Sequence, residues 1–170
     1  HIDRFQVYPW SPGAVKLLNE AGFLAVIITN QSGVARGYFP ESLLHETHAS
    51  LQDLLARGGA HLDGIYYCPH HPDGKVAAFR QQCGCRKPGT ALLEKAARDL
   101  NIDLTSSYVV GDRYNDLEAG FRVNALGILV LTGYGKGEYQ YLRDSWQRQP
   151  DHVAQDLGGA IQWILRQPAG

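Results

Sequence analysis

The sequence predicts an α/β fold with a mostly parallel sheet, and two observations lead to that prediction. Short apolar runs rich in β-branched residues alternate along the chain with segments of helical periodicity, which is the pattern of βαβ units. Several of these runs are apolar throughout, as expected of strands that are buried on both faces of a parallel sheet. With 170 residues, the chain is long enough to bury its own core, and we expect a single domain over residues 1–170.

The first part of the chain contains five expected elements. Residues 1–8 alternate weakly and suggest an edge strand or a hairpin arm. A serine-proline pair opens the helix expected over 11–22, and a glycine ends it. The apolar run 23–28 predicts a strand buried on both faces. A second helix is expected over 40–59, where a proline begins it and two glycines end it. Residues 64–67 are expected to form a short strand.

The second part continues the alternation, and its clearest element is the amphipathic helix over 91–100. The polar stretch 134–150 is not assigned. The other expected elements, in chain order, are a strand over 107–110, a helix over 116–122, strands over 126–131 and 152–154, and a helix over 157–165.

The composition excludes several classes of function. The formal net charge is −1 and both signs are interspersed, so there is no basic stripe for nucleic acid and no patch for an anionic membrane. No apolar run approaches the roughly 20 residues of a membrane span. The three cysteines form one cluster instead of a disulfide framework, which favours a reducing compartment. We therefore expect a cytoplasmic monomer that acts on a small molecule.

The most specific signal is a cluster of metal-ligating residues near the middle of the chain. Cys68 and His70 form a Cys-x-His pair, and Cys83 and Cys85 form a Cys-x-Cys pair. Three thiolates and one imidazole are ligands that tetrahedral zinc prefers. The sequence therefore predicts a zinc site, with His70 and His71 both open as its nitrogen ligand.

Two cations follow the last cysteine directly. Arg86 offers a planar fork of donors and Lys87 a point charge, and both suit an anionic group such as phosphate. An exposed basic pair after a loop is the alternative interpretation. Pro88 and a metal-bound Cys85 would restrict the backbone here, and the residues alone leave both interpretations open.

Two further polar clusters follow predicted strands. Residues 29–33, Thr-Asn-Gln-Ser-Gly, offer hydroxyl, amide and backbone N–H groups that suit a phosphate, although any loop contains such residues. Asp112 and Asp116 offer carboxylates that suit Mg²⁺, although an N-cap aspartate with a solvated neighbour gives the same pattern. Ligands of parallel sheets bind beyond the carboxyl ends of the strands, where these clusters and the zinc loop are expected to lie.

Together these segments resemble the haloacid dehalogenase superfamily of aspartate-nucleophile phosphatases, and most closely its D-glycero-D-manno-heptose 1,7-bisphosphate phosphatases. Residues 29–37 resemble the second motif of that family, 68–72 and 83–88 its zinc loop and third motif, and 111–113 its fourth. The resemblance implies a Rossmann-like three-layer α/β/α fold with a zinc-binding loop and no large cap domain. It also implies a small phosphosugar as the substrate.

The resemblance implies a role for each candidate residue. Thr29 would hold the transferring phosphoryl group and Lys87 would neutralise it, so these two are the expected catalytic residues. Asp112 would bind Mg²⁺, with Asp116 beside that ion. The substrate would be bound by Thr29, Asn30, Gln31, Ser32, Arg86 and Lys87, and a structural zinc ion by Cys68, His70, Cys83 and Cys85.

The family pattern opens with Asp-x-Asp on the first strand, where the first aspartate is the nucleophile and the second the general acid/base. The sequence has no such pair, Asp3-Arg4 is not one, and the chain has no methionine. We therefore expect that the chain lacks the N-terminal first strand of its domain. The complete protein would form an aspartyl-phosphate, and the chain as written would have no turnover.

The leading interpretation is a Mg²⁺-dependent phosphatase that removes the 7-phosphate of heptose 1,7-bisphosphate. A histidinol-phosphate phosphatase is the nearest alternative because it shares the zinc loop. The long spacer between His70 and Cys83 and the run 32–37 favour the heptose enzyme, whereas 89–91, Gly-Thr-Ala, departs from the family pattern. A non-catalytic, zinc-bearing phosphosugar-binding protein without a nucleophile is the third interpretation.

Overall fold

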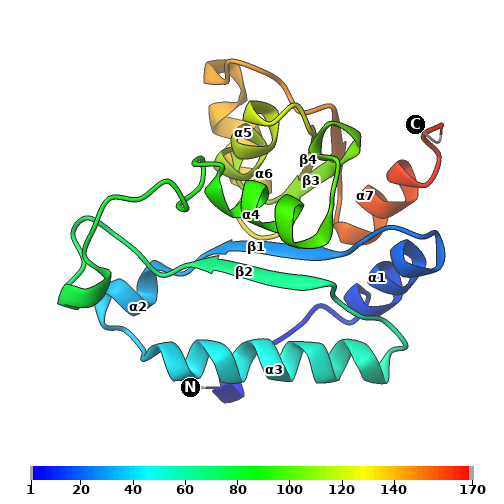
Figure 1. The fold of residues 1–170 in the computed structure, drawn as a ribbon. Coiled ribbons are helices and arrows are strands. Elements are labelled where there is room, and N and C mark those ends of the chain that lie inside the picture. The colour runs from blue at the N-terminus through cyan, green and yellow to red at the C-terminus, as the bar shows by residue number, and fades with distance from the viewer. Residues whose placement is uncertain (1, 169–170) are drawn as a thin grey trace. The chain divides into compact units, whose positions relative to one another are not determined.

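The computed structural model describes residues 2–168, and the chain divides into two compact units, 1–86 and 87–170. Each unit contains its own sheet, and every strand pair among the described residues is parallel (Figure 1). The predicted α/β class is therefore confirmed. The expectation of a single domain stays a prediction.

Unit 1 is built on the parallel pair β1 and β2, with α3 running along it in Figure 1. The register pairs Val26 with Gly64 and Asn30 with Cys68, so both strands end at the same edge. The elements of this unit are η1 Ile2–Arg4, α1 Ser11–Glu20, β1 Val26–Asn30, α2 Ser32–Arg36, α3 Glu41–Arg57, β2 Gly64–Cys68 and η2 Ala77–Phe79.

Unit 2 is built on three parallel strands in the order β3-β4-β5. The middle strand is buried at four of its five positions, since it has a neighbour on each side. The elements are α4 Ala91–Leu100, η3 Leu104–Ser106, β3 Tyr108–Gly111, α5 Tyr114–Arg122, β4 Leu126–Val130, α6 Gly135–Leu142, η4 Arg143–Ser145, β5 His152–Ala154 and α7 Leu157–Ile164.

Helices cover both faces of the unit 2 sheet. Val109 of β3 packs against Gly120 of α5. The preceding residue, Tyr108, contacts Trp163 of α7 edge to face. Because successive strand residues point to opposite faces, α5 and α7 must lie on opposite sides. This unit therefore has the expected three layers.

Two predictions for unit 1 are wrong. Residues 2–8 form no strand: η1 closes a turn in which Phe5 N donates to Ile2 O at 2.8 Å, and residue 1 lies outside the described part. The strand expected over 23–28 begins only at Val26, and its residues are half-buried instead of buried. Among the described residues of this unit, β1 pairs with β2 and with no second strand.

Local boundaries differ in two places of interest. Thr29 and Asn30 are the last residues of β1, and residues 32–36 continue as the short helix α2 instead of a loop. The unassigned stretch 134–150 contains the two-turn helix α6 and then η4. Its helical character was hidden in the sequence because α6 has only one buried residue, Gly135, and thus no apolar stripe.

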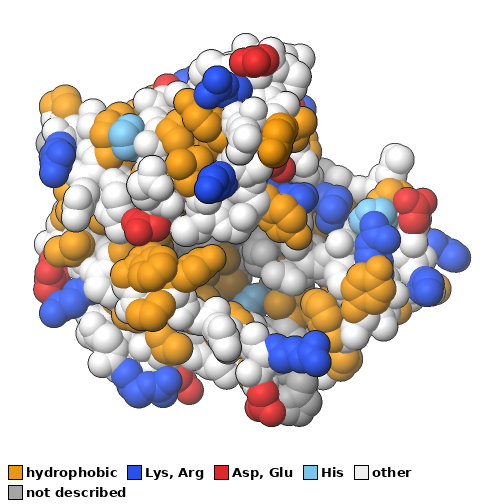
Figure 2. Space-filling view, turned by 180° about the vertical axis from the view of Figure 1, so that it is seen from behind, with side chains coloured by type: hydrophobic (Ala, Val, Ile, Leu, Met, Phe, Trp, Pro, Cys, Tyr) orange, Lys and Arg blue, Asp and Glu red, His pale blue; other side chains and the backbone are white. Residues whose placement is uncertain are grey.

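None of the helices in the described part is both long and apolar enough to cross a bilayer. Acidic and basic side chains are interspersed on the face shown in Figure 2, without a field of one sign.

Leu117 of α5 is fully buried against the unit 2 sheet, whereas Leu142 at the end of α6 is 48% exposed. We predict that Leu117→Ala lowers the free energy of unfolding by about 2–5 kcal/mol, because the lost contacts leave a cavity. Leu142→Ala should change it by less than about 1 kcal/mol. Urea unfolding followed by circular dichroism measures both values, and an equal effect of the two substitutions would contradict this core.

Candidate active site and metal centre

The carboxyl ends of β1 and β2 bring two of the predicted motifs to one edge in unit 1. Gln31 N donates to Cys68 O at 2.8 Å, which extends the strand pairing by one step. The side chain of Gln31 also donates to Thr29 Oγ1 at 3.0 Å. The polar segment that ends β1 therefore lies beside the first cysteine of the zinc loop.

The predicted zinc ligands converge at the start and end of that loop. Cys68, His70, Cys83 and Cys85 each place one ligand atom within 4.8 Å of all the others. The Sγ atom of Cys85 lies 2.8 Å from that of Cys68, 3.1 Å from that of Cys83 and 3.2 Å from Nδ1 of His70. Zinc–sulfur bonds of about 2.3 Å in a tetrahedron require a cluster of about this size. The donor set and its spacing fit zinc.

The protonation of the cysteines depends on their surroundings. Burial, followed by contacts with the neighbouring thiols, raises the pKa of Cys85 far above its usual range. Burial also raises the pKa of Cys68. Burial opposes ionisation of Cys83 too, but hydrogen bonds from the Cys85 and Cys68 thiols and from backbone N–H groups lower its pKa overall. Three thiolates this close together need a cation to neutralise them, and a divalent metal ion supplies that charge.

The structure separates the two histidines that the sequence left open. His70 joins the cysteines, whereas the two ring nitrogens of His71 lie 2.9 Å from Arg36 Nη2 and 3.1 Å from Asp73 N. His71 therefore contacts the last residue of α2 and the loop instead of the cysteine cluster. The geometry favours His70 as the nitrogen ligand.

Arg86 is tied to the cysteine cluster through its backbone. The thiolate of Cys83 accepts a hydrogen bond from the backbone N–H of Arg86, which is one of the contacts that lower the pKa of Cys83. The Nη1 atom of Arg86 is buried and has no hydrogen-bond partner among the described residues. An unpaired buried guanidinium nitrogen is costly, and an anionic ligand would satisfy it.

In unit 2, Lys87 and Asp116 form an ion pair. Lys87 Nζ lies 2.7 Å from Asp116 Oδ1, and each side chain is only 14% exposed. Asp116 Oδ2 accepts a hydrogen bond from Arg113 N at 3.2 Å, which caps the first turn of α5. A Cβ atom at Gly111 would lie 2.6 Å from Asp116 Oδ2, so this strand end needs glycine. Asp116 therefore orients the lysine and closes the helix.

Asp112 follows Gly111 at the carboxyl end of β3, and the segment after β4 holds its side chain. Asp112 Oδ2 accepts a hydrogen bond from Tyr134 N at 2.9 Å. Gly133 has φ +57°, and a Cβ there would clash with Asp112 Oδ2. A fixed, half-buried carboxylate at a strand end fits a hard ion such as Mg²⁺. Asp116 is already paired with Lys87, so Asp112 is the better placed ligand of the two.

Sequence reasoning missed two sets of contacts. The pair Arg36–His71 joins α2 to the zinc loop, and the only signal for it was the position of Arg36 inside the second motif. Glu138 of α6 contacts Arg113 and the backbone of Tyr114, and it lay in the stretch that had no assignment. No sequence signal marked it, because α6 has no apolar stripe.

Comparison with known proteins adds to this geometry. A family model described as HAD-hydrolase-like matches residues 84–160. D-glycero-beta-D-manno-heptose-1,7-bisphosphate 7-phosphatase of Yersinia pestis is 46% identical over 135 residues, which are 79% of this chain and 71% of that protein. D-glycero-D-manno-heptose-1,7-bisphosphate 7-phosphatase of Thermosynechococcus vestitus is 39% identical over 171 residues, 96% of this chain and 85% of that protein.

A solved structure agrees with these relatives. The D,D-heptose 1,7-bisphosphate phosphatase from B. bronchiseptica, complexed with magnesium and phosphate, matches with a TM-score of 0.85 and 31% identity. The match covers 98% of this chain and 88% of that one. Fold and family model define the class as phosphoric monoester hydrolases of the haloacid dehalogenase type. Within that class, the chain belongs to the D-glycero-D-manno-heptose-1,7-bisphosphate 7-phosphatase family, and the expected resemblance is confirmed.

The two neighbouring histidines offer a matched test of the metal centre. We predict that His70→Ala lowers zinc affinity by at least about tenfold, because one of the four ligands is lost. His71→Ala should retain the affinity, since His71 contacts Arg36 and Asp73 instead. Competition with a zinc chelator, read by optical absorbance, measures both. A larger loss in His71→Ala would reverse the assignment.

Proposed function

We propose that this chain carries the phosphate-handling part of a Mg²⁺-dependent phosphatase that hydrolyses the 7-phosphate of D-glycero-D-manno-heptose 1,7-bisphosphate. The proposal includes a cytoplasmic location and a role in supplying heptose precursors of the lipopolysaccharide core. The observation that carries it is the largely buried ion pair between Lys87 and Asp116. Asp116 lies on α5, the helix that follows Asp112. The names and similarity of the relatives support the substrate.

Lys87 is largely buried and ion-paired with Asp116, which suits a side chain that binds phosphate. A lysine that is 14% exposed and paired with a carboxylate is held in position. Phosphoryl transfer requires such positioned groups more than it requires covalent chemistry. Because Asp116 holds the ammonium group in place, the lysine loses little conformational entropy when it neutralises a phosphoryl oxygen. In this proposal Asp112 holds Mg²⁺, which supplies further neutralisation of the phosphoryl oxygens when bound.

The substrate contacts come from residues at the end of β1 and from the residue after the zinc loop. Thr29 binds the transferring phosphoryl group through its hydroxyl, which Gln31 already orients by donating to it. Asn30 and Ser32 contact the sugar phosphate. The buried, unpartnered Nη1 of Arg86 donates to substrate oxygen. Zinc on the cysteine cluster is structural in this proposal, and it fixes the backbone of Arg86 through Cys83.

The proposed reaction proceeds through an aspartyl-phosphate. A carboxylate oxygen attacks phosphorus, the bond to the sugar oxygen breaks, and the leaving oxygen takes a proton from a general acid. Water then attacks the aspartyl-phosphate and releases inorganic phosphate. The 170 residues contain no Asp-x-Asp pair, so the proposal assigns the nucleophile and the general acid to residues outside this sequence.

The test compares two substrates with the complete product of the gene, purified and supplied with Mg²⁺. We predict a kcat/KM for heptose 1,7-bisphosphate at least about tenfold above that for histidinol phosphate, which is about 1.4 kcal/mol of transition-state discrimination. The 170-residue chain, assayed in parallel as the control, should show no turnover because it has no nucleophile. Equal or reversed preference would contradict the substrate, and turnover by the control chain would contradict the assigned nucleophile.

A further inference from the structure

The segment after β4 makes several contacts with the turn that carries Asp112, and Tyr134 and Glu138 provide them. That turn runs from Asp112 at the end of β3 to Tyr114 at the start of α5. The contacting segment runs from Gly133 to Glu138 and includes the first turn of α6. Both segments belong to unit 2. The question is what keeps the Asp112 carboxylate in one orientation.

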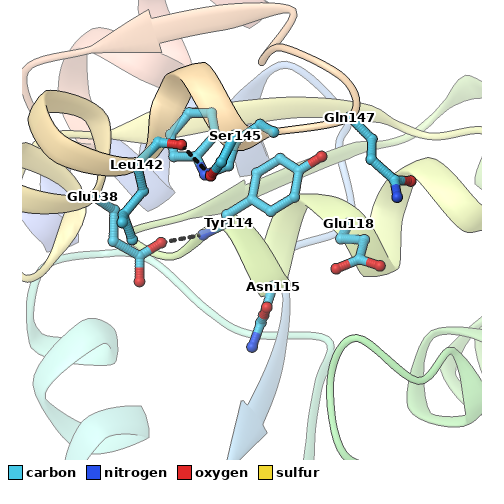
Figure 3. A pocket seen from close by; sticks show the side chains of 8 residues that line it. Tyr114, Asn115, Glu118, Glu138, Leu142, Ser145 and Gln147 are labelled. Atoms are coloured by element: carbon cyan, nitrogen blue, oxygen red, sulfur yellow. Dashed lines mark hydrogen bonds between the residues drawn. The ribbon is translucent and has the colours of Figure 1, made fainter.

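Glu138 reaches the turn with both of its carboxylate oxygens. Oε2 accepts a hydrogen bond from the backbone N–H of Tyr114 at 2.7 Å, as Figure 3 shows. Oε1 lies 3.7 Å from Nε of Arg113. The Glu138 side chain is only 19% exposed, so these contacts are partly shielded from water and are worth more than the same contacts on an open surface.

A second contact ties the two segments together at the metal ligand itself. Tyr134 N donates to Asp112 Oδ2 at 2.9 Å, and the Arg113 guanidinium carbon lies 4.0 Å from the centre of the Tyr134 ring. Asp112, Arg113 and Tyr114 are thus each held by the same short segment. Glu138 lies one helical turn beyond Tyr134 and contacts the last two residues of the turn, Arg113 and Tyr114.

The carboxylate of Glu138 is not simply solvated, because it accepts a hydrogen bond from a backbone N–H group at the start of α5. The N–H of Tyr114 is one of the first N–H groups of α5, which have no partner inside the helix, and Asp116 already caps its neighbour Arg113. A negative charge near a helix start is favourable. Glu138 thus completes the cap of α5 from another helix, and in doing so it fixes the residue two positions after Asp112.

We propose that Glu138 is a positioning residue that holds the Asp112–Tyr114 turn so that the Asp112 carboxylate faces Mg²⁺. This inference rests on the proposed role of Asp112 as a Mg²⁺ ligand. Residues that orient a ligand from behind commonly change metal affinity by about 10- to 100-fold when they are removed. Glu138 does not contact the reacting atoms in this account, so its loss should act through the metal.

The experiment measures Mg²⁺ binding by isothermal titration calorimetry on the metal-free, complete gene product, without substrate. We expect Glu138→Ala to weaken Mg²⁺ binding by about 10- to 100-fold. Glu138→Gln should lose less than about tenfold, because its amide oxygen still accepts the hydrogen bond from Tyr114. The matched control is Glu94→Ala. Glu94 is an exposed glutamate on α4 that accepts a hydrogen bond from Thr90 Oγ1, and the variant should bind Mg²⁺ as the parent does.

A kinetic measurement separates positioning from general damage. In Glu138→Ala, the Mg²⁺ concentration for half-maximal rate should rise, whereas kcat at saturating Mg²⁺ should stay close to that of the parent. Thermal unfolding by circular dichroism verifies the fold of each variant. If Glu138→Ala does not fold, Glu138→Asp takes its place, because the shorter side chain pulls the oxygens away from Tyr114 and should also weaken binding.

Three outcomes overturn the proposal. Unchanged Mg²⁺ affinity in Glu138→Ala contradicts it directly. A loss in Glu138→Gln as large as that in Glu138→Ala contradicts the role of the Tyr114 hydrogen bond. Asp112→Asn serves as the reference: if it leaves Mg²⁺ binding unchanged, the metal assignment in the proposed function is wrong as well. If it weakens binding while Glu138→Ala does not, only the positioning role is wrong.

Discussion

Parallel strand pairing is the constraint on which the rest of this structure depends. In unit 1 it brings the ends of β1 and β2 to one edge, so that Gln31 bonds to Cys68 and the polar end of β1 meets the zinc loop. In unit 2 it brings the end of β3 and the segment after β4 together, so that Tyr134 bonds to Asp112. Within each unit, residues far apart in the sequence thereby meet at the carboxyl end of its sheet.

Two kinds of charge compensation act at these edges. The cysteines of the zinc loop lie close together, and burial raises the pKa of Cys68 and Cys85. A bound cation would stabilise their thiolate forms. Lys87 instead finds its counter-charge inside the protein, in Asp116. The first arrangement fixes a backbone, and the second fixes a charged side chain. In the proposed function, both would reduce the ordering that binding of a phosphate requires.

Much of this could be predicted from the sequence because the signals were local. The helix over 91–100 and the strand over 152–154 have the predicted bounds, since apolar periodicity and terminating residues agree there. The cysteine cluster was visible in the spacing of its residues alone. The residues alone left His70 and His71 open, and the family resemblance favoured His70. The tertiary contacts of His71 with Arg36 and Asp73 could not be predicted from the sequence.

The same reason explains the errors. The apolar run 23–28 predicted a strand with two covered faces, but burial depends on neighbours, and in its unit β1 has only β2 beside it. Glu138 had no pattern of its own, because α6 has no apolar stripe and the partner of the glutamate lies on α5. A polar contact between two elements leaves no periodic trace in either of them.

The most direct test of the central claim is the position of the phosphate that leaves. Phosphorus NMR of heptose 1,7-bisphosphate incubated with the complete gene product and Mg²⁺ distinguishes the two phosphates during the reaction. We predict that the 7-phosphate resonance disappears, that inorganic phosphate appears in equal amount, and that the 1-phosphate remains. Loss of the 1-phosphate first, or persistence of both signals with active, metal-loaded protein, would contradict it.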